Sequence, residues 1–530
     1  NGAIIITTKK GAKGNGKVSY SNSFRWDKAY GYPEIQTKYA NGMYGVTNYY
    51  SQSRFGGLYP EGTKLYDNIA AVLQTGFSQQ HNIAVEGGTD KITVRGSGAY
   101  TDQKGVVKTT DFTKLNISLN GRAEITKWLN FEANMSYAGT TNTKALKGNG
   151  GPLQKAVRWP LTDNMLDWQN PDGSQRQPNL YTDTDLLNPL FALYKNRNYD
   201  ETERMQVNFS LNATPTKNTF IRATMGWDVG IGNYEYHTHP WYANPTSSSY
   251  GVGSYNLTKE QWKDQALNVL AGYNNEWGKF SFSVQVGYHQ QEKGTEQLST
   301  QGSNFQVIDF YGLANCDPAT ILTRTRTRMR RTQAFSGQVE LGYNNMAFVT
   351  LRARNDWSST LPKGNNSYFY PALELSFVAT ELPFLKQQTA VSYLKLRGAA
   401  AQVGKDASPY TTNTYMWASA TVLPGFTGIG NDWSAGHRFL KPERQRAWEV
   451  GAELKFFNGR LGIDYTYYNS VTGNQIAAPR LCQSTGYIFL TINSGSVKNQ
   501  GMELMITGTP VEICRPDYDW EKGGYWYGAN

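Results

Sequence analysis

The stretch that decides the fold of this 530-residue chain is Thr113-Lys-Leu-Asn-Ile-Ser-Leu-Asn-Gly-Arg-Ala-Glu-Ile-Thr-Lys-Trp-Leu-Asn-Phe-Glu-Ala-Asn-Met-Ser-Tyr137. Apolar residues and glycine occupy every second position from Leu115 to Ile125, and polar residues lie between them. Thr126-Lys127-Trp128 interrupts the alternation, which resumes from Leu129. Side chains on a β-strand alternate between two faces, so the pattern predicts a hairpin with one apolar face and one polar face. Each arm has about ten residues, enough for a tilted strand to cross the hydrocarbon layer of a membrane.

The same alternation returns along the chain. It is found at 18–26, 79–85, 92–100, 205–213, 221–227, 267–273, 280–288, 335–343, 349–353, 373–377, 394–398, 448–454, 461–467 and 502–506. Asn458-Gly459, a frequent hairpin turn, separates two of these segments. Residues 27–78, 138–202 and 229–264 lack the period, and we expect long irregular connections there. The pattern predicts roughly sixteen or seventeen strands.

The connections decide the fold class. Short turns alternate with long ones, as in outer-membrane barrels, which have short periplasmic turns and long extracellular loops. The hydrophobic content of 39% and the mean hydropathy of −0.57 resemble those of a soluble protein. A membrane barrel gives the same values, because its apolar residues occupy alternate positions. We therefore predict an all-β fold, a large antiparallel transmembrane β-barrel. Plugged barrels have about 22 strands, so we expect the last strands to be missing.

Five phrases, in order along the chain, resemble one family. They are Asn1-Gly-Ala-Ile-Ile-Ile-Thr-Thr-Lys-Lys-Gly11, Arg354-Asn-Asp-Trp-Ser-Ser359, Leu394-Lys-Leu-Arg397, Leu440-Lys-Pro-Glu443 and Asn499-Gln-Gly501. Together they are similar to the SusC/RagA family of TonB-dependent outer-membrane transporters. Two positions depart from that family's pattern: Leu361 stands where Phe is usual, and Ala400-Ala401 replaces an aromatic residue.

The resemblance implies a domain organisation and a function. Residues 1–12 would end a plug domain, and residues 13–530 would form the transmembrane barrel. The chain would then be part of a longer protein that imports oligosaccharides or oligopeptides across the bacterial outer membrane. Its partners would be a SusD-like surface lipoprotein, outer-membrane lipid, and the TonB complex acting through a segment before Asn1. Two alternatives remain: a non-energised pore or surface-complex component, and a soluble β-rich glycan-binding protein.

Other chemistry has little support in the residues. No nucleotide-binding or hydrolase motif is present, so we predict no enzyme, no catalytic residue and no cofactor. Candidate metal ligands are the histidines of His237-Thr-His239 and the loop carboxylates Asp163, Asp167 and Asp172. Neither set has the complete ligand spacing of a known site, so we predict no metal site. The net charge of +10 is spread along the chain and does not favour nucleic acid. Its one dense run, Arg324 to Arg331, places four arginines on one strand face, as expected for a lumen wall or an extended loop strand.

Two groups of residues are candidates for function. On the polar face of the first hairpin, we predict that Asn116, Asn120, Arg122 and Glu124 face the lumen. Aromatic rings stack on sugars and on peptide side chains, and binding residues are frequent in loops. Loop aromatics are therefore the candidate ligand-binding residues: Trp159, Trp168, Tyr234, Tyr236, Trp241, Trp417 and Trp433. The alternative is that these rings order the loops or lie in an interfacial girdle.

Overall fold

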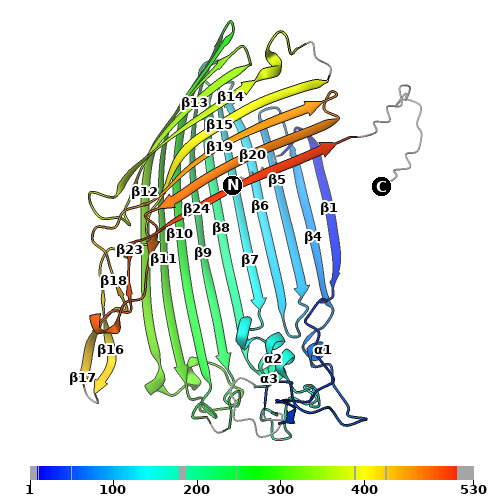
Figure 1. Ribbon diagram of the computed structural model, residues 1–530. Coiled ribbons are helices and arrows are strands. Elements are labelled where there is room, and N and C mark those ends of the chain that lie inside the picture. Colours follow the sequence, from blue (N-terminus) through cyan, green and yellow to red (C-terminus); the bar gives the residue numbers. More distant parts are fainter. Residues whose placement is uncertain are drawn as a thin grey trace. The chain divides into compact units, whose positions relative to one another are not determined.

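The computed structural model describes residues 9, 11–48, 51–177, 187–245, 247–386, 390–423 and 426–509 (Figure 1). Residues 1–8 and 10, and with them most of the phrase expected to end a plug domain, lie outside this part. The chain divides into two compact units. The first contains the described residues up to Thr216, with Ile221–Val269 and His289–Arg331, and the second contains Lys217–Phe220, Leu270–Tyr288 and the described residues from Thr332.

The main element is a sheet of sixteen strands in the described residues, and neighbours in the sheet follow one another in sequence. This confirms the predicted large antiparallel sheet. Its strands are β1 (Gly14–Asp27), β4 (Gly76–Gly88), β5 (Ile92–Lys104), β6 (Asp111–Thr126), β7 (Leu129–Thr143), β8 (Arg197–Ala213), β9 (Thr219–Thr238), β10 (Ser254–Trp277), β11 (Phe280–Ser303), β12 (Leu322–Tyr343), β13 (Ala347–Ser358), β14 (Ser367–Val378), β15 (Val391–Lys405), β19 (Glu443–Phe456), β20 (Leu461–Gly473) and β24 (Ser496–Gly508).

Short elements lie in the connections. The strands are β2 (Gly42–Met43), β3 (Val46–Thr47), β16 (Met416–Leu423), β17 (Phe426–Asn431), β18 (Ser434–Ala435), β21 (Ile476–Ala477), β22 (Phe489–Leu490) and β23 (Ile492–Asn493). The α-helices are α1 (Asn68–Val72), α2 (Pro152–Arg158) and α3 (Pro189–Lys195). Single 3₁₀ turns occupy Gly148–Gly150, Leu313–Asn315, Pro318–Thr320, Ala379–Glu381 and Gln483–Thr485. No helix in the described residues has the length and apolar content needed to cross a membrane.

The hairpin predicted at Thr113–Tyr137 is confirmed as β6 and β7. Leu119 faces Met135 and Asn120 faces Asn134, so apolar and polar rows continue across both strands. Ile117 and Leu119 are 52% and 49% exposed, and neither packs into a core. A row of large exposed apolar side chains on one face is what a lipid-facing surface requires. We call this side of the sheet the apolar face and the opposite side the polar face.

The strands are longer than the alternation indicated. The expectation that 229–264 is irregular is wrong at both ends, because β9 continues to Thr238 and β10 begins at Ser254. Likewise, within 138–202, β7 reaches Thr143 and β8 begins at Arg197. Alternation disappears where both faces of a strand contact water, since polar residues are then suitable on both sides. The sequence pattern therefore marks the membrane-facing length of each strand and not its full hydrogen-bonded length.

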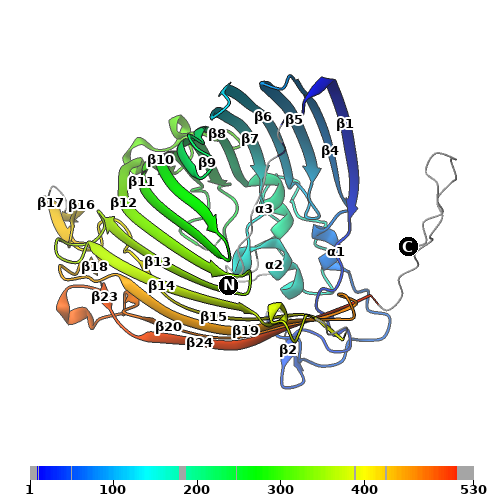
Figure 2. The same cartoon turned by 90° about the horizontal axis from the view of Figure 1, so that it is seen from above.

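Connection lengths follow the predicted asymmetry. At one end of the strands the connections are tight turns, such as Lys127-Trp128 after β6 and Gly278-Lys279 after β10. The predicted Asn458-Gly459 turn joins β19 and β20, with φ angles of 57° and 87°, which favour these two residue types. At the other end, residues 28–75 and 144–196 form long connections that carry α1, α2 and α3. These three helices lie together below the ends of β4–β7 (Figures 1 and 2).

A buried core holds these two connections together within the first unit. Its fully buried side chains include Val72 from one connection, and Trp159 and Met165 from the other. Arg54 donates hydrogen bonds to the carbonyl oxygens of Val157 and Trp159, at 2.7 and 2.6 Å. Proline at the first position starts both α2 and α3, as its fixed φ and missing N–H favour. The long connections of this unit thus contain a packed core of their own.

One of the family phrases has a structural role in the second unit. Ser358, at the end of β13, is 2% exposed, and its hydroxyl donates to Asp406 Oδ2 at 2.5 Å. The hydroxyl of Thr360 also contacts this carboxylate, at 3.2 Å. Both residues are therefore tied to the segment that follows β15. This gives a structural role to Ser358, the first hydroxyl residue after Arg354-Asn-Asp-Trp.

Candidate functional site

The polar face of β8–β11 in the first unit carries a network of charged side chains. Arg204 on β8 forms an ion pair with Asp228 on β9, and Gln206 donates to the same carboxylate at 3.1 Å. Further along the sheet, Asp264 on β10 accepts from Gln291 at 2.9 Å and lies 3.1 Å from Lys293 Nζ. These contacts bridge neighbouring strands, so most charges here are neutralised within the wall.

Two aromatic rings lie against the same face. A Cβ atom at Gly230 would be 2.2 Å from Trp262 Cζ2, and a Cβ atom at Gly232 would be 2.6 Å from Tyr234 Oη. Glycine at these positions therefore lets the rings approach the backbone of the sheet. Trp262 also donates a hydrogen bond to Asp228. Both rings are half-buried, so part of each remains accessible for stacking on a sugar or a planar side chain.

Among the predicted ligand-binding residues, Tyr234 and Tyr236 lie on β9 and not in a loop as expected. Trp159 is completely buried, and its Nε1 donates to Asp163 Oδ2 at 2.9 Å, so its ring fills the loop core. Trp168 packs beside that core and stacks on Tyr194 with 5.1 Å between ring centroids. Their placement favours the alternative that these two tryptophans order the loop.

The remaining loop aromatics are not brought together with these residues. Trp241 is half-buried, and its ring centroid lies 5.4 Å from that of His239. Trp433, in the second unit, is 63% exposed. The side chain of Trp417 lies outside the described residues, although its backbone belongs to β16. Ligand contact by any of these rings stays a prediction.

The predicted lumen-facing residues share one face of β6. Asn116, Asn120 and Glu124 are half-buried on the face opposite Leu119, whereas Arg122 is more exposed. The Nη2 atom of Arg122 donates to Asn130 Oδ1 on β7 at 3.4 Å. All four side chains thus lie on the polar face of the sheet. That this face lines the lumen of the barrel stays a prediction.

The two candidate metal-ligating histidines lie in a buried cluster at the end of β9, where His237 is in the strand and His239 follows it. His237 stacks on Tyr311 with 3.7 Å between ring centroids, and His239, only 1% exposed, lies 3.4 Å from Asp309 Oδ1. Asp309 also pairs with Lys195 at 3.1 Å. Among the described residues, no group of three or more His, Cys, Asp or Glu side chains is arranged to hold a metal ion. This cluster joins the connection 304–321 to the C-terminal end of α3.

The acidic loop residues also have partners within the protein. Asp163 Oδ1 accepts from Arg176 at 2.6 Å, while its other oxygen accepts from Trp159. Asp172 accepts from the hydroxyl and the backbone N–H of Ser174, which holds the pKa of its carboxyl below the usual range. Asp163 and Asp172 thus stabilise the fold of this connection.

The buried histidine predicts a pH dependence. Burial lowers the pKa of His239 from 6.5 to about 4, so the folded loops favour the neutral ring. Stability from this group is fully present above pH 6.5, falls as the pH decreases from 6.5 towards 4, and levels off below. We expect protease cleavage within 304–321 to be faster at pH 5 than at pH 7.5. In a His239→Gln variant, the difference between the cleavage rates at pH 5 and pH 7.5 should be smaller. An unchanged difference would show that other titrating groups cause the pH dependence.

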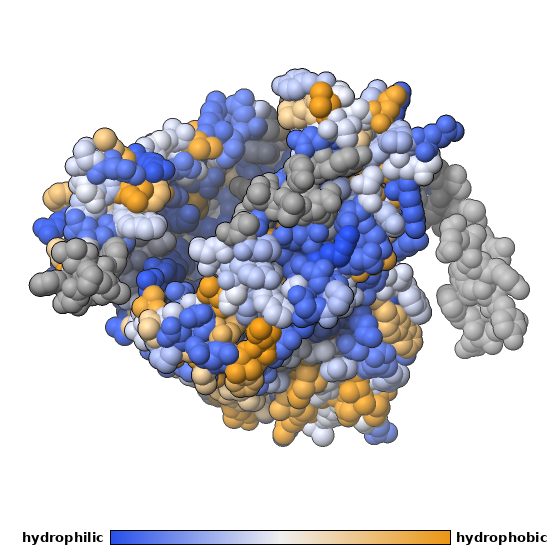
Figure 3. Space-filling view, turned by 90° about the horizontal axis from the view of Figure 1, so that it is seen from below, coloured by the Kyte–Doolittle hydropathy of each residue, from blue (hydrophilic) through white to orange (hydrophobic). Residues whose placement is uncertain are grey.

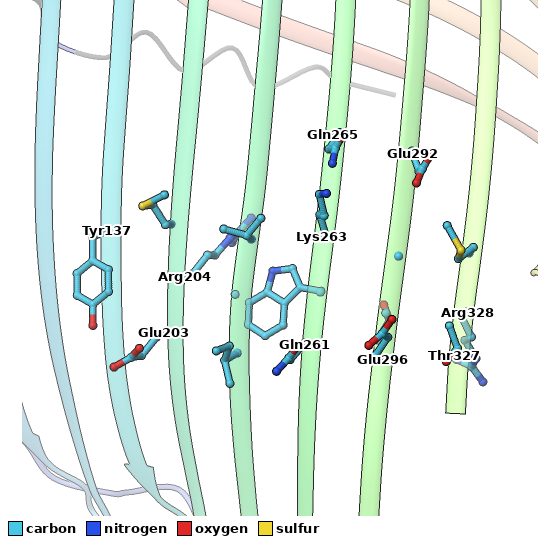
Figure 4. Close-up of a pocket in the computed structure, with 18 residues that line it drawn as sticks. Tyr137, Glu203, Arg204, Gln261, Lys263, Gln265, Glu292, Glu296, Thr327 and Arg328 are labelled. Atoms are coloured by element: carbon cyan, nitrogen blue, oxygen red, sulfur yellow. The ribbon is translucent and has the colours of Figure 1, made fainter. Parts of the chain in front are cut away.

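A groove of about 640 Å³ lies on the other face of the sheet (Figure 4). The exposed apolar side chains of Met205 and Ile231 line it, together with Lys263 and Glu292 towards the polar ends of the strands. The wall here is a single sheet, and residues of the polar face such as Arg204 also border the groove. Its outward-pointing side chains share the apolar face of the sheet, whereas the candidate site lies on the polar face, so this groove is not part of the candidate site.

The match to a family model decides the relationship. Residues 158–530 match the model described as "TonB dependent receptor-like, beta-barrel". The chain belongs to this family. Family barrels are proteins of the bacterial outer membrane, and the exposed apolar face of the sheet fits that location. The predicted barrel class is thereby confirmed.

Relatives of this TonB-dependent receptor-like barrel support the same relationship. The TonB-dependent receptor SusC of Bacteroides thetaiotaomicron is 26% identical over 561 residues, covering 98% of this chain and 53% of SusC. The TonB-dependent receptor P26 of Formosa agariphila is 22% identical and covers the same shares. The chain thus spans about half the length of these curated relatives.

Solved structures show the same fold. A structure of the RagAB peptide importer in its "closed-closed" state superimposes with a TM-score of 0.77 at 19% identity, covering 96% of this chain and 60% of that chain. The siderophore receptor PirA of Acinetobacter baumannii gives a TM-score of 0.51 at 13% identity. At these identities the likeness concerns the fold alone.

Sequence reasoning missed Trp262 of this barrel. The residue lies within 229–264, which was expected to be irregular, so its position on a strand was hidden. The sequence Gly230-Ile-Gly232 could have indicated this site. Glycines at alternate positions of a strand leave one face without side chains, so that a large ring can pack against the backbone there.

Proposed function

We propose that this chain is the barrel part of an importer that takes up oligosaccharides or oligopeptides through the bacterial outer membrane. Family membership supports this proposal, as do the relatives named SusC and RagAB. The observation that carries it is the contrast between the two faces of the sheet. One face exposes apolar rows, while the other carries bridged charges and two accessible aromatic rings.

The polar face suits a transport path. Cargo must bind well enough to enter and weakly enough at several sites to leave. Charges that are already paired, such as Arg204 with Asp228, offer hydrogen bonds without holding an ionic cargo tightly. Partial stacking on Trp262 and Tyr234 adds contacts that tolerate different sugars or side chains.

The end carrying the long connections would receive cargo and a SusD-like lipoprotein lid. Seen from that end, the described surface is mostly hydrophilic (Figure 3). The connections of the first unit contain a buried core around Trp159, which favours a preformed docking surface. The TonB complex would supply energy through a plug.

Uptake in cells tests this proposal. In a bacterium lacking the complete protein, we expect loss of uptake of labelled oligosaccharides or oligopeptides, restored by the complete gene. Uptake should also fail when TonB is deleted. Uptake that requires the protein but not TonB would indicate a non-energised pore, and normal uptake in the deletion strain would contradict import altogether. Co-purification with a SusD-like lipoprotein tests the partner separately.

A further inference from the structure

A row of arginines lies at the start of β12, on the same face as the candidate site. Arg331 pairs with Glu292 at 2.5 Å, and Thr323 contacts Thr300 at 3.1 Å, which sets the register of β12 against β11. Even-numbered residues of β11, such as the exposed Val286 and Leu298, belong to the apolar face. Odd-numbered residues of β12 share that face, so Arg324, Arg326, Arg328 and Arg330 lie on the polar face.

The first three arginines of this row are not neutralised. Neighbouring members of the row are separated by about 7 Å along the strand. Within the described part of the chain, no carboxylate pairs with Arg324, Arg326 or Arg328. Other basic residues of the polar face do have partners, such as Arg352 with Glu374 and Arg397 with Asp464 in the second unit. A row of like charges repels itself, and an anion bound along it removes that repulsion.

The aromatic rings lie at the same level of the sheet. Thr258 on β10 contacts Ser299 on β11 at 2.8 Å. Counting from these two contacts in an antiparallel sheet places Trp262 level with Arg328, two strands away and thus about 10 Å distant. The arginine row and Trp262 are therefore parts of one surface, and Thr295 on β11 lies between Trp262 and Arg328.

We propose that this surface binds an oligosaccharide that carries repeated anionic groups, either carboxylates or sulfates. Arginine forks bind planar carboxylates and sulfate oxygens through paired hydrogen bonds, and the ring of Trp262 stacks on the sugar. The periodic row fits a polymer with a charge on successive units better than a single charged group. This inference rests on the proposed function and specifies its cargo.

Binding measurements on the complete protein in detergent test the inference. The probes are a uronic acid oligomer, a sulfated oligosaccharide, a neutral glucose oligomer and an acidic peptide. We expect at least one of the two anionic oligosaccharides to bind at least tenfold more tightly than the neutral one, and less tightly at high salt. Comparing the two anionic probes identifies the anionic group. Equal binding of neutral and anionic oligomers, or tight binding of the acidic peptide alone, would overturn the proposal.

Matched variants locate the binding face. Arg324→Gln with Arg326→Gln removes two charges from the polar face, and we expect binding of the preferred anionic oligosaccharide to weaken about tenfold. Lys259→Gln with Lys263→Gln removes two charges from the opposite face of β10 and should leave binding unchanged. Equal losses in both doubles would indicate an effect of net charge and overturn the site. The double variant Arg324→Lys with Arg326→Lys retains both charges and serves as the folding control. We expect it to bind the anionic oligosaccharide more tightly than the Gln double variant does.

Uptake separates this inference from the proposed function. If TonB-dependent uptake is normal for a neutral oligosaccharide but absent for both anionic oligosaccharides, the importer stands and the anionic cargo is refuted. If the complete protein supports uptake of no cargo, the importer itself is refuted.

Discussion

Replacing Trp159 with alanine is expected to lower the local unfolding free energy of the long connections by about 3–5 kcal/mol. The ring is completely buried among Val72, Met165 and Leu190, and these come from three different parts of the connections. Its removal leaves a cavity that the surrounding side chains fill only partly. The loss of the Nε1 hydrogen bond also leaves one oxygen of Asp163 without this partner.

Hydrogen exchange of the backbone amides in 144–177 measures this change, because the connection opens separately from the strands. The control is Leu153→Ala in α2, where the side chain is 42% exposed and the expected change is within about 0.5 kcal/mol. Exchange in β6 and β7 should be the same in both variants. If Trp159→Ala left loop exchange unchanged, the ring would not support the loop core.

Replacing Leu119 with arginine is expected to destabilise the membrane-inserted protein by about 2–4 kcal/mol. The side chain is 49% exposed on the apolar face, between Ile117 and Gly121 along β6. A charge here would lie in hydrocarbon. The adjacent Asn120→Arg places the same charge on the polar face, where the side chain of Asn134 faces it across the hairpin.

Denaturant unfolding of the complete protein in lipid vesicles measures both changes. We expect Asn120→Arg to be much milder than Leu119→Arg, although the residues are neighbours in the sequence. Equal damage would refute the assignment of the two faces. Normal behaviour of both variants would indicate that β6 does not contact lipid.

The sequence pattern predicted those strands of which one face is apolar and the other is polar. The hairpin at Thr113–Tyr137 and the turn at Asn458-Gly459 are examples, because alternation and turn chemistry are local properties. The extensions of β9 and β10 could not be predicted in this way, since polar residues occupy both faces there. The burial of Trp159 depends on Val72, which is distant in sequence, and no local pattern reports such packing.

The candidate site was predicted only in part. Tyr234 was singled out for its ring, but its supposed loop is a strand. Trp262 packs over Gly230 of the neighbouring strand, and this contact depends on strand pairing, which no local sequence pattern reports. The alternate spacing of the arginines predicts that they share one strand face, but only the register of β12 against β11 identifies that face as the polar one.

β10 and β11 are so long that part of each strand is exposed to water outside the membrane while still hydrogen-bonded within the sheet. Each strand has 24 residues, or about 80 Å of chain, far more than a bilayer covers even for a tilted strand. The region around Lys263 and Glu292 is thus surrounded by water, although its backbone remains hydrogen-bonded to neighbouring strands. A rigid, wettable wall continues outside the membrane, and solvent accessibility there is no measure of flexibility. If the chain imports cargo as proposed, these hydrogen-bonded strands would contact the cargo before it reaches the plane of the bilayer.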